Sequence, residues 1–294
     1  MKILVTGANG QLGNEMRYVL EQNAPGTAIY TDIDTLDLTD ARAVEKAVLE
    51  NDITHIVNCA AYTNVDRAEE DKQLSYAVNV TAVKNIALAA DKAGAKVIHI
   101  STDYVFDGKG HRPYTEADKV NPVSQYGATK REGETALLAL APDSIIIRTA
   151  WLYSPHGKNF VKTMIALGRD KNELRVVCDQ IGTPTYALDL ANTIFAILRS
   201  PQWIPGIYHF TDEGVCSWYD FTVSIHKLYG IETCKVRPIL SADYPTPAAR
   251  PFYSVLDKSR IRSTFGIEIP HWERSLAHCI NRLKEKEEAA DGNA

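Results

Sequence analysis

Short apolar runs alternate along the first half of the chain with longer stretches that have one apolar face. The short runs are residues 2–6, 27–31, 53–58, 96–100 and 144–148. Such runs are typical of strands that are buried on both faces of a parallel sheet. Residues 14–23, 76–94 and 124–140 repeat apolar positions every three or four residues, which predicts helices. The alternation predicts an α/β fold with a doubly wound parallel sheet of the Rossmann type.

After residue 150 the pattern loosens, and short strands and helices follow one another less regularly. We expect residues 1–150 to form a dinucleotide-binding domain, whose sheet also takes a helix and a strand from about 186–210. Residues 151–185 and 211–294 then form a second, smaller, mixed α/β cap over the carboxyl ends of the strands. Ligands of doubly wound sheets bind in the crevice at that edge.

Composition narrows the class of protein. The 294 residues are 45% hydrophobic and 23% charged, with a net charge of -5, which describes an ordinary globular protein without a basic surface for nucleic acid. Five cysteines without a CxxC pair argue against a disulfide framework or a structural zinc. The chain opens on a strand and has no apolar run of bilayer length. We therefore expect a cytoplasmic protein without a nucleic-acid or membrane partner.

A glycine-rich turn joins the first strand to the first helix. Its spacing is GxxGxxG rather than GxGxxG, and strand, turn and helix together form the context that dinucleotide sites need. Glycines let the backbone approach a pyrophosphate, and the helix amino terminus offers that anion free N–H groups. The cofactor contacts expected in this turn are Gly7, Gly10, Gln11, Leu12 and Gly13.

An acidic residue follows the second strand, at the distance from the glycine turn where a ribose hydroxyl is usually held. Asp32 would bond that hydroxyl and repel a 2′-phosphate, which favours NAD over NADP. Alternatively, Asp32 only ends the strand and Asp34 or Asp37 makes the contact. Asp37 and Leu38 are expected at the adenine pocket, where Leu38 supplies an apolar wall.

Small residues after the third strand permit a further close approach to the cofactor. The residues expected there are Ala60, Ala61, Tyr62 and Thr63. Asn79 lies inside the helix predicted over residues 76–94, and a buried amide needs hydrogen-bond partners. Bracing the backbone beside the cofactor is a role that suits it.

A hydroxyl, a phenol and an ammonium form the candidate catalytic group. Thr102 follows the strand over residues 96–100, while Tyr126 and Lys130 lie four residues apart on one helix face. An ammonium beside a phenol lowers the pKa of the phenol, so Tyr126 becomes a proton donor near neutral pH. Such a pair is also common on solvated helix surfaces, and only its place at the sheet edge favours catalysis.

Several longer motifs add a family resemblance. The motifs are GxxGxxG at Gly7, Tyr126-x-x-x-Lys130, Gly10-Gln-Leu-Gly13, Ser101-Thr-Asp-Tyr-Val-Phe-Asp-Gly108, Arg148-Thr-Ala-Trp-Leu-Tyr153, Asn159-Phe-Val-Lys-Thr163, Asp179-Gln-Ile-Gly-Thr-Pro184 and Arg250-Pro251. Together they resemble the dTDP-4-dehydrorhamnose reductases of the extended short-chain dehydrogenase/reductase superfamily. They spread over most of the chain and are specific jointly rather than singly.

The resemblance implies an enzyme that uses NADH or NADPH to reduce the C4 ketone of dTDP-6-deoxy-L-lyxo-4-hexulose to dTDP-L-rhamnose. Tyr126 would give the proton, Thr102 would hold the ketone oxygen and Lys130 would also bond the nicotinamide ribose. The cap would bind the dTDP-linked 4-keto-6-deoxy sugar. The expected substrate contacts are Thr102, Asp103, Tyr104, Trp151, Asn159, Phe160 and Arg250. Trp151 could instead be a core aromatic, and Arg250 a surface cation.

The sequence also allows a metal site and other activities of the same fold. Relatives with Mg²⁺ between subunits make Glu15 a weak metal candidate and Asp189 a second one, although Glu15 also suits the first turn of a helix. A homodimer is expected, and hydride transfer does not need the metal. Alternative activities are a nucleotide-sugar epimerase or dehydratase, or a dinucleotide-binding regulatory subunit like that of methionine adenosyltransferase. Asp103 is followed by Tyr104 and not by the Glu that elimination favours.

The ribose assignment of Asp32 can be tested by substitution. Asp32→Ala removes the acceptor for the ribose hydroxyl and the repulsion of a 2′-phosphate, so affinity for NADH should fall more than affinity for NADPH. Fluorescence titration of both cofactors measures the two losses, and equal losses would contradict the assignment.

Overall fold

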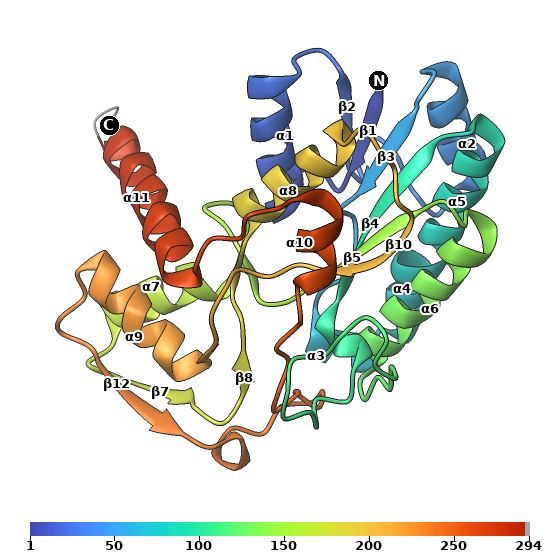
Figure 1. Ribbon diagram of the computed structural model, residues 1–294. Coiled ribbons are helices and arrows are strands. Elements are labelled where there is room, and N and C mark those ends of the chain that lie inside the picture. Colours follow the sequence, from blue (N-terminus) through green and yellow to red (C-terminus); the bar gives the residue numbers. More distant parts are fainter. Residues whose placement is uncertain (292–294) are drawn as a thin grey trace.

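A six-stranded parallel sheet forms the centre of the protein in a computed structural model that describes residues 1–291 (Figure 1). Its strands, in their order across the sheet, are β2 (Ala28–Thr31), β1 (Ile3–Thr6), β3 (His55–Asn58), β4 (Lys96–Thr102), β5 (Ile145–Thr149) and β10 (Gly206–His209). Neighbours pair in parallel throughout. The predicted doubly wound α/β class is confirmed, and the order reverses between β1 and β3, where such sheets bind ligands.

Helices cover both faces of this sheet (Figure 1). The helices on one face are α1 (Gln11–Asn23) and α8 (Ala187–Arg199), and those on the other are α2 (Ala41–Glu50), α5 (Ala82–Ala93) and α6 (Gln125–Leu140). Along β1, Ile3 and Val5 pack with the α1 side and Leu4 packs with the α2 side. Each strand therefore buries both sets of its alternating side chains, which explains its unbroken apolar pattern.

The helix predicted over residues 76–94 is interrupted in the structure. Within this range a π-helical turn (Ala77–Thr81) precedes α5, and two short helices, α3 (Val65–Glu70) and α4 (Lys72–Tyr76), come before the turn. Asn79 lies in the π turn, where its amide bonds both backbone groups of Tyr62. Gly133 of α6 presses on the same turn, since a Cβ there would lie 2.2 Å from the Asn79 carbonyl oxygen. Turns of this kind are frequent at functional sites.

Polar residues replace apolar ones at the carboxyl end of the sheet, on the face covered by α6. Thr6, Asn58 and His99 pair across β1, β3 and β4 and form one buried row. Nearby, Arg148 of β5 makes a two-pronged ion pair with Glu134 of α6, with both N–O distances at 2.8 Å. The two side chains are 1% and 0% exposed.

The cap lies to one side of the carboxyl edge and contains three longer helices around small sheets (Figure 1). The helices are α7 (Phe160–Asp170), α9 (Trp218–Tyr229) and α11 (Trp272–Asp291), whereas the shorter α10 (Ser259–Phe265) lies against β10 of the central sheet. The strand pairs are β7 (Glu173–Val177) with β12 (Lys235–Ile239), β8 (Ile181–Gly182) with β11 (Cys216–Ser217), and β6 (Leu152–Tyr153) with β9 (Thr185–Tyr186). Two 3₁₀ turns cover Asp103–Val105 and Ser241–Asp243.

No helix within residues 1–291 is both long enough and apolar enough to cross a bilayer.

The buried Arg148–Glu134 pair should contribute strongly to stability. Burial opposes ionisation of Glu134, but the hydrogen bonds and charge of Arg148 outweigh it and lower the pKa of Glu134. Glu134→Gln should therefore reduce the free energy of unfolding at pH 7 by about 3–5 kcal/mol, because it leaves a guanidinium buried without its countercharge. Urea unfolding measures the loss.

Glu173→Gln is the matched control, because Glu173 forms an exposed ion pair with Arg237. Its unfolding curve should stay close to that of the wild type, since exposed pairs contribute little. Equal losses in the two variants would contradict the structural role given to the buried pair.

Candidate active site

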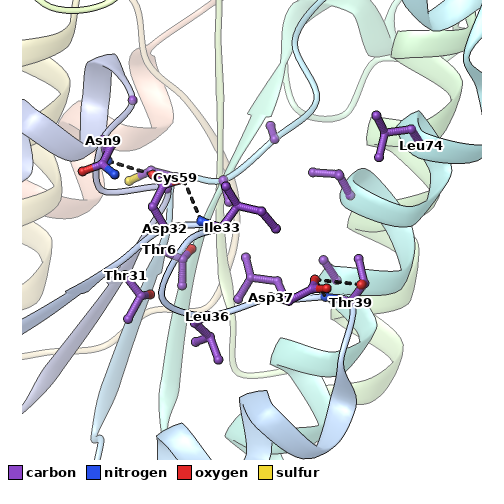
Figure 2. Close-up of a pocket in the computed structure, with 17 residues that line it drawn as sticks. Thr6, Asn9, Thr31, Asp32, Ile33, Leu36, Asp37, Thr39, Cys59 and Leu74 are labelled. Atoms are coloured by element: carbon purple, nitrogen blue, oxygen red, sulfur yellow. Dashed lines mark hydrogen bonds between the residues drawn. The ribbon is translucent and has the colours of Figure 1, made fainter.

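The glycine turn opens into a cavity of about 480 Å³ at the carboxyl ends of β1, β2 and β3 (Figure 2). Predicted cofactor residues that line this cavity are Gly7, Gly10, Asp32, Asp37, Leu38, Ala60 and Ala61. Leu36 and Leu74 add apolar walls opposite the turn. The combination of an open turn and an apolar slot suits the phosphates and adenine of a dinucleotide.

Asp32 anchors the glycine turn to the end of β2. One carboxylate oxygen accepts from the backbone N–H of Asn9 at 2.8 Å, and the other accepts from that of Ile33 at 2.8 Å. Asp37 instead bonds Thr39, whose hydroxyl and backbone N–H lower the pKa of that carboxyl (Figure 2). Both acids thus line the cavity, and the ribose contact of Asp32 stays a prediction.

Close backbone approach requires glycine at two points of the turn. A Cβ at Gly13 would lie 2.2 Å from the Gly7 carbonyl oxygen, and a Cβ at Gly7 would lie 2.7 Å from the Ala60 nitrogen. Gly7 also has a φ of 65°, a left-handed value that favours glycine. Gly10 caps α1 without a side chain, so the first N–H groups of the helix can face an anion.

A second cavity of about 580 Å³ adjoins the first, and Gly7, Gly10, Cys59 and Ala61 line both. Predicted residues that line the second cavity are Gln11, Leu12, Thr63, Thr102, Asp103, Tyr104, Tyr126, Lys130, Trp151, Asn159 and Phe160. The three candidate catalytic residues therefore share one cavity with the glycine turn. Gly13, Tyr62, Asn79 and Arg250 lie outside the linings that the described residues form.

Lys130 extends from α6 into the wall of the second cavity. It is 2% exposed, and its ammonium donates to the Ile100 carbonyl at 2.7 Å and lies 3.4 Å from His99 Nε2. Thr102 donates to an Asp103 oxygen at 2.9 Å and accepts from the Tyr104 backbone at 3.2 Å. Burial raises the pKa of Asp103 to about 6, although the bond from Thr102 opposes this.

The prediction that Lys130 lowers the pKa of Tyr126 is wrong for this structure. Burial raises the pKa of Tyr126 above that of a free phenol; a hydrogen bond with Thr102 opposes the shift, and Asp103 adds to it. The charge of Lys130, whose ammonium donates to the Ile100 carbonyl, does not outweigh this burial. Tyr126 therefore carries its proton at neutral pH, and it can still donate that proton to an alkoxide, which is the stronger base.

Aromatic side chains form the wall of the second cavity on the cap side. Trp151 stacks on Trp218 with ring centroids 3.5 Å apart, and Phe160 lies 4.5 Å from Trp218. Trp151 has a φ of 49°, a strained value for a bulky residue, and Gly182 makes room for its ring. Trp218, the first residue of α9, thus belongs to the wall of this cavity.

Comparisons with known proteins identify the family. A family model described as the RmlD substrate binding domain matches residues 1–285. A dTDP-4-dehydrorhamnose reductase from Aggregatibacter actinomycetemcomitans is 41% identical over 94% of this chain and 97% of its own length. The chain belongs to this reductase family. The predicted resemblance is confirmed.

Two solved structures of the family are close to this one. A dTDP-4-dehydrorhamnose reductase from Clostridium acetobutylicum is 47% identical, with a TM-score of 0.93 over 97% of this chain and 100% of that chain. A second, from Bacillus anthracis and in complex with NADP, is 37% identical with a TM-score of 0.91 over 96% of this chain and 100% of that one.

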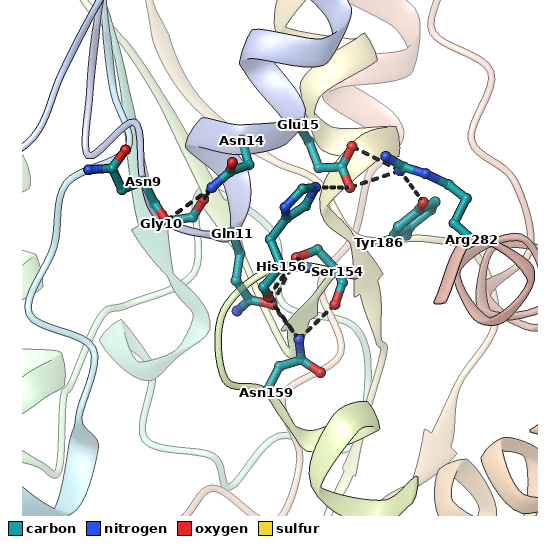
Figure 3. Close-up of polar contacts among 10 residues, drawn as sticks. All are labelled: Asn9, Gly10, Gln11, Asn14, Glu15, Ser154, His156, Asn159, Tyr186 and Arg282. Carbon is teal, nitrogen blue, oxygen red and sulfur yellow. Dashed lines mark hydrogen bonds and ion pairs between the residues drawn. The ribbon is translucent and has the colours of Figure 1, made fainter. Parts of the chain in front are cut away.

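In this family member, Gln11 links the glycine turn to the segment that enters the cap (Figure 3). Its side-chain oxygen accepts from Asn159 at 2.9 Å and from Ser154 at 3.3 Å. Asn159 also bonds the Ser154 carbonyl and caps α7 through its own oxygen. Gln11 and Asn159, both predicted as ligand contacts, are thus joined to each other in the wall of the second cavity.

Glu15 faces an arginine in place of a metal (Figure 3). It is 0% exposed, and both its oxygens accept from Arg282 of α11, at 2.8 and 2.9 Å. The other candidate, Asp189, accepts from Ser275. Residues 1–291 contain no group of three metal-ligating side chains. The Mg²⁺ site considered from the sequence lies between subunits and stays a prediction. The first-turn interpretation of Glu15 is wrong, because α1 begins at Gln11 and has no acid in its first turn.

Arg250 reaches the site only at its edge. One nitrogen pairs with Asp66 at 2.6 Å, and the other lies 3.5 Å from the Tyr104 hydroxyl. Tyr104 in turn packs edge to face with Tyr126, with centroids 5.4 Å apart. The family-implied contact of Arg250 with a diphosphate stays a prediction.

Sequence reasoning missed five residues around the catalytic group. Asn58, His99, Glu134 and Arg148 are buried behind it, and Trp218 lines the cavity from the cap. A signal existed for His99, because it interrupts the apolar run over residues 96–100. Buried polar residues need hydrogen-bond partners. Strand pairing brings Asn58 to His99, and Arg148 pairs with Glu134 on α6.

The close packing of the glycine turn gives a direct test. Gly13→Ala places a Cβ against the Gly7 carbonyl, so the turn must shift and NADPH affinity should fall about tenfold or more. Glu21→Ala is the control, because Glu21 is exposed on the same helix and away from the turn, so NADPH affinity should stay close to that of the wild type. Fluorescence titration of NADPH compares the two, and equal affinities would contradict the packing argument.

Proposed function

We propose that this protein reduces the C4 ketone of dTDP-6-deoxy-L-lyxo-4-hexulose to dTDP-L-rhamnose, with NADH or NADPH as the reductant. The observation that carries the proposal is that Thr102, Tyr126 and Lys130 share one cavity with the glycine turn. Family membership supports the substrate, since a curated relative at 41% identity is named for this reaction.

Tyr126 is the proton donor in the proposed reaction. It keeps its proton at neutral pH because burial raises its pKa, and it gives that proton to the C4 oxygen as the ketone is reduced. Thr102 holds the same oxygen. The buried Lys130 ammonium offsets part of the cost of the phenolate that Tyr126 leaves behind.

The first cavity and the glycine turn would hold the dinucleotide. A bound reduced nicotinamide would supply the hydride to C4. The N–H groups at the start of α1 would hold its pyrophosphate, and Leu36 and Leu38 would contact the adenine. Asp32 favours NADH, whereas the Bacillus anthracis relative is in complex with NADP, so both cofactors belong in the test.

The cap would hold the sugar nucleotide. Trp151 and Phe160 offer apolar faces to the sugar or base, and Asp103 and Tyr104 offer polar contacts to the sugar. Arg250 is close enough to Tyr104 to meet a diphosphate at the cavity edge. Residues 151–185 and 211–294 act as the substrate domain of a cytoplasmic enzyme that works as a homodimer.

The activity test follows the cofactor and identifies the sugar. NADH and NADPH oxidation with the dTDP-ketosugar should be stoichiometric, with rhamnose and not its C4 epimer as the product. An epimerase or dehydratase would consume no net cofactor. A regulatory subunit would bind the dinucleotide, co-purify with a synthetase and reduce no ketosugar, and either result would overturn the proposal.

Tyr126→Phe tests the proton donor alone. The ring and its packing remain, so NADPH affinity should change little, while kcat should fall about a hundredfold or more because the proton source is lost. Steady-state kinetics and cofactor titration measure both. Unchanged turnover would remove Tyr126 from the mechanism.

A further inference from the structure

A buried hydrogen-bond chain runs along the polar row of the sheet and ends at Lys130. The Asn58 side-chain oxygen accepts from the Thr6 hydroxyl at 2.7 Å and from the Ala60 backbone N–H at 3.2 Å. Its side-chain nitrogen lies 2.9 Å from His99 Nδ1, and His99 Nε2 lies 3.4 Å from the Lys130 nitrogen. Asn58 and His99 are 1% and 0% exposed.

The Ala60 N–H fixes the direction of this chain. A backbone N–H can only donate, so the Asn58 oxygen must face it and the Asn58 NH₂ must face His99. The opposite amide orientation would bring two donors together at 3.2 Å. His99 Nδ1 therefore accepts. Burial, and next the charge of Lys130, lower the pKa of His99, so the ring is neutral and its single proton is on Nε2.

We propose that this order makes His99 a positioning residue for Lys130, holding the imidazole as the Nε2–H tautomer and aiming that N–H at the lysine nitrogen. The inference rests on the proposed reduction, in which Lys130 assists Tyr126. A neutral lysine amine has a lone pair that can accept from this N–H. A lysine ammonium has only donors, so its N–H groups and the His99 N–H repel each other. His99 thus favours the neutral form of Lys130.

The groups around Lys130 shift its pKa in both directions. The titratable and charged groups around it are His99 on β4, Glu134 and Tyr126 on α6, Arg148 on β5, Cys59 after β3 and Asp103 after β4. Burial lowers the pKa of Lys130 to about 8, and Glu134 opposes the shift. Arg148 occupies both oxygens of Glu134, which weakens that opposition. Activity should therefore fall as the pH rises through this range, because the ammonium that favours the phenolate is lost.

The tautomer can be measured on the wild-type protein without any substrate. Nitrogen-15 NMR of labelled histidine distinguishes protonated from unprotonated ring nitrogens, and the His99→Gln spectrum identifies the His99 signals among those of the eight histidines. We expect a proton on Nε2 and none on Nδ1 at pH 7. A proton on Nδ1, or on both nitrogens, overturns the proposal.

Asn58→Asp tests the consequence for Lys130. A carboxylate accepts from both Ala60 and His99, so the tautomer should invert to Nδ1–H and leave Nε2 to accept from the ammonium. The high-pH limb of the kcat profile should then move up by about one pH unit or more. Asn172→Asp, at an exposed position, adds the same charge and should keep the wild-type limb.

The outcomes separate the two proposals. An unchanged tautomer in Asn58→Asp, or an inverted one with an unmoved limb, overturns the role of His99. If Asn58→Asp does not fold, the wild-type spectrum still decides. A wild type that reduces no ketosugar contradicts the proposed function instead, and the spectrum continues to test the hydrogen-bond order.

Discussion

The buried ion pair between Arg148 and Glu134 fixes the position of α6 on the sheet, and the catalytic group depends on that position. Tyr126 and Lys130 both lie on α6, so the ammonium can reach the Ile100 carbonyl only if the helix neither slides nor rotates. An ion pair without access to water tolerates little displacement, because separation would leave two buried charges uncompensated. Gly133 adds a steric limit at the π turn.

Two kinds of close contact meet at the carboxyl edge. On one side of the site, the backbone of the glycine turn lies directly against the backbone of Ala60, without side chains between them. Space and free N–H groups therefore remain for a large anion. On the cap side, Trp151, Trp218 and Phe160 supply a rigid apolar wall. Gln11 connects the two sides through Asn159. The parts expected to bind cofactor and sugar are therefore one connected structure.

Local pattern was enough to predict the strands of the central sheet and most helices, and it named three residues that the structure brings into one cavity. The run over residues 96–100 places Thr102 at the sheet edge whatever the rest of the chain does. Local pattern gave no sign of the π turn at Ala77–Thr81, which packs closely against Gly133 on another helix. The partner of Glu15 is Arg282, at the far end of the chain. The predicted lowering of the Tyr126 pKa was wrong because burial, which raises it, depends on the folded protein and not on local sequence.

The position of α8 and β10 in the chain has a consequence for biosynthesis. Both complete the sheet layer, since β10 is an edge strand beside β5 and α8 packs on α1, yet both follow the first part of the cap. On the ribosome, the apolar flank of α1 stays uncovered until α8, which ends at residue 199, has left the exit tunnel. The nascent amino-terminal half therefore needs the later segment to finish folding, and a fragment that stops at residue 150 would expose an apolar surface.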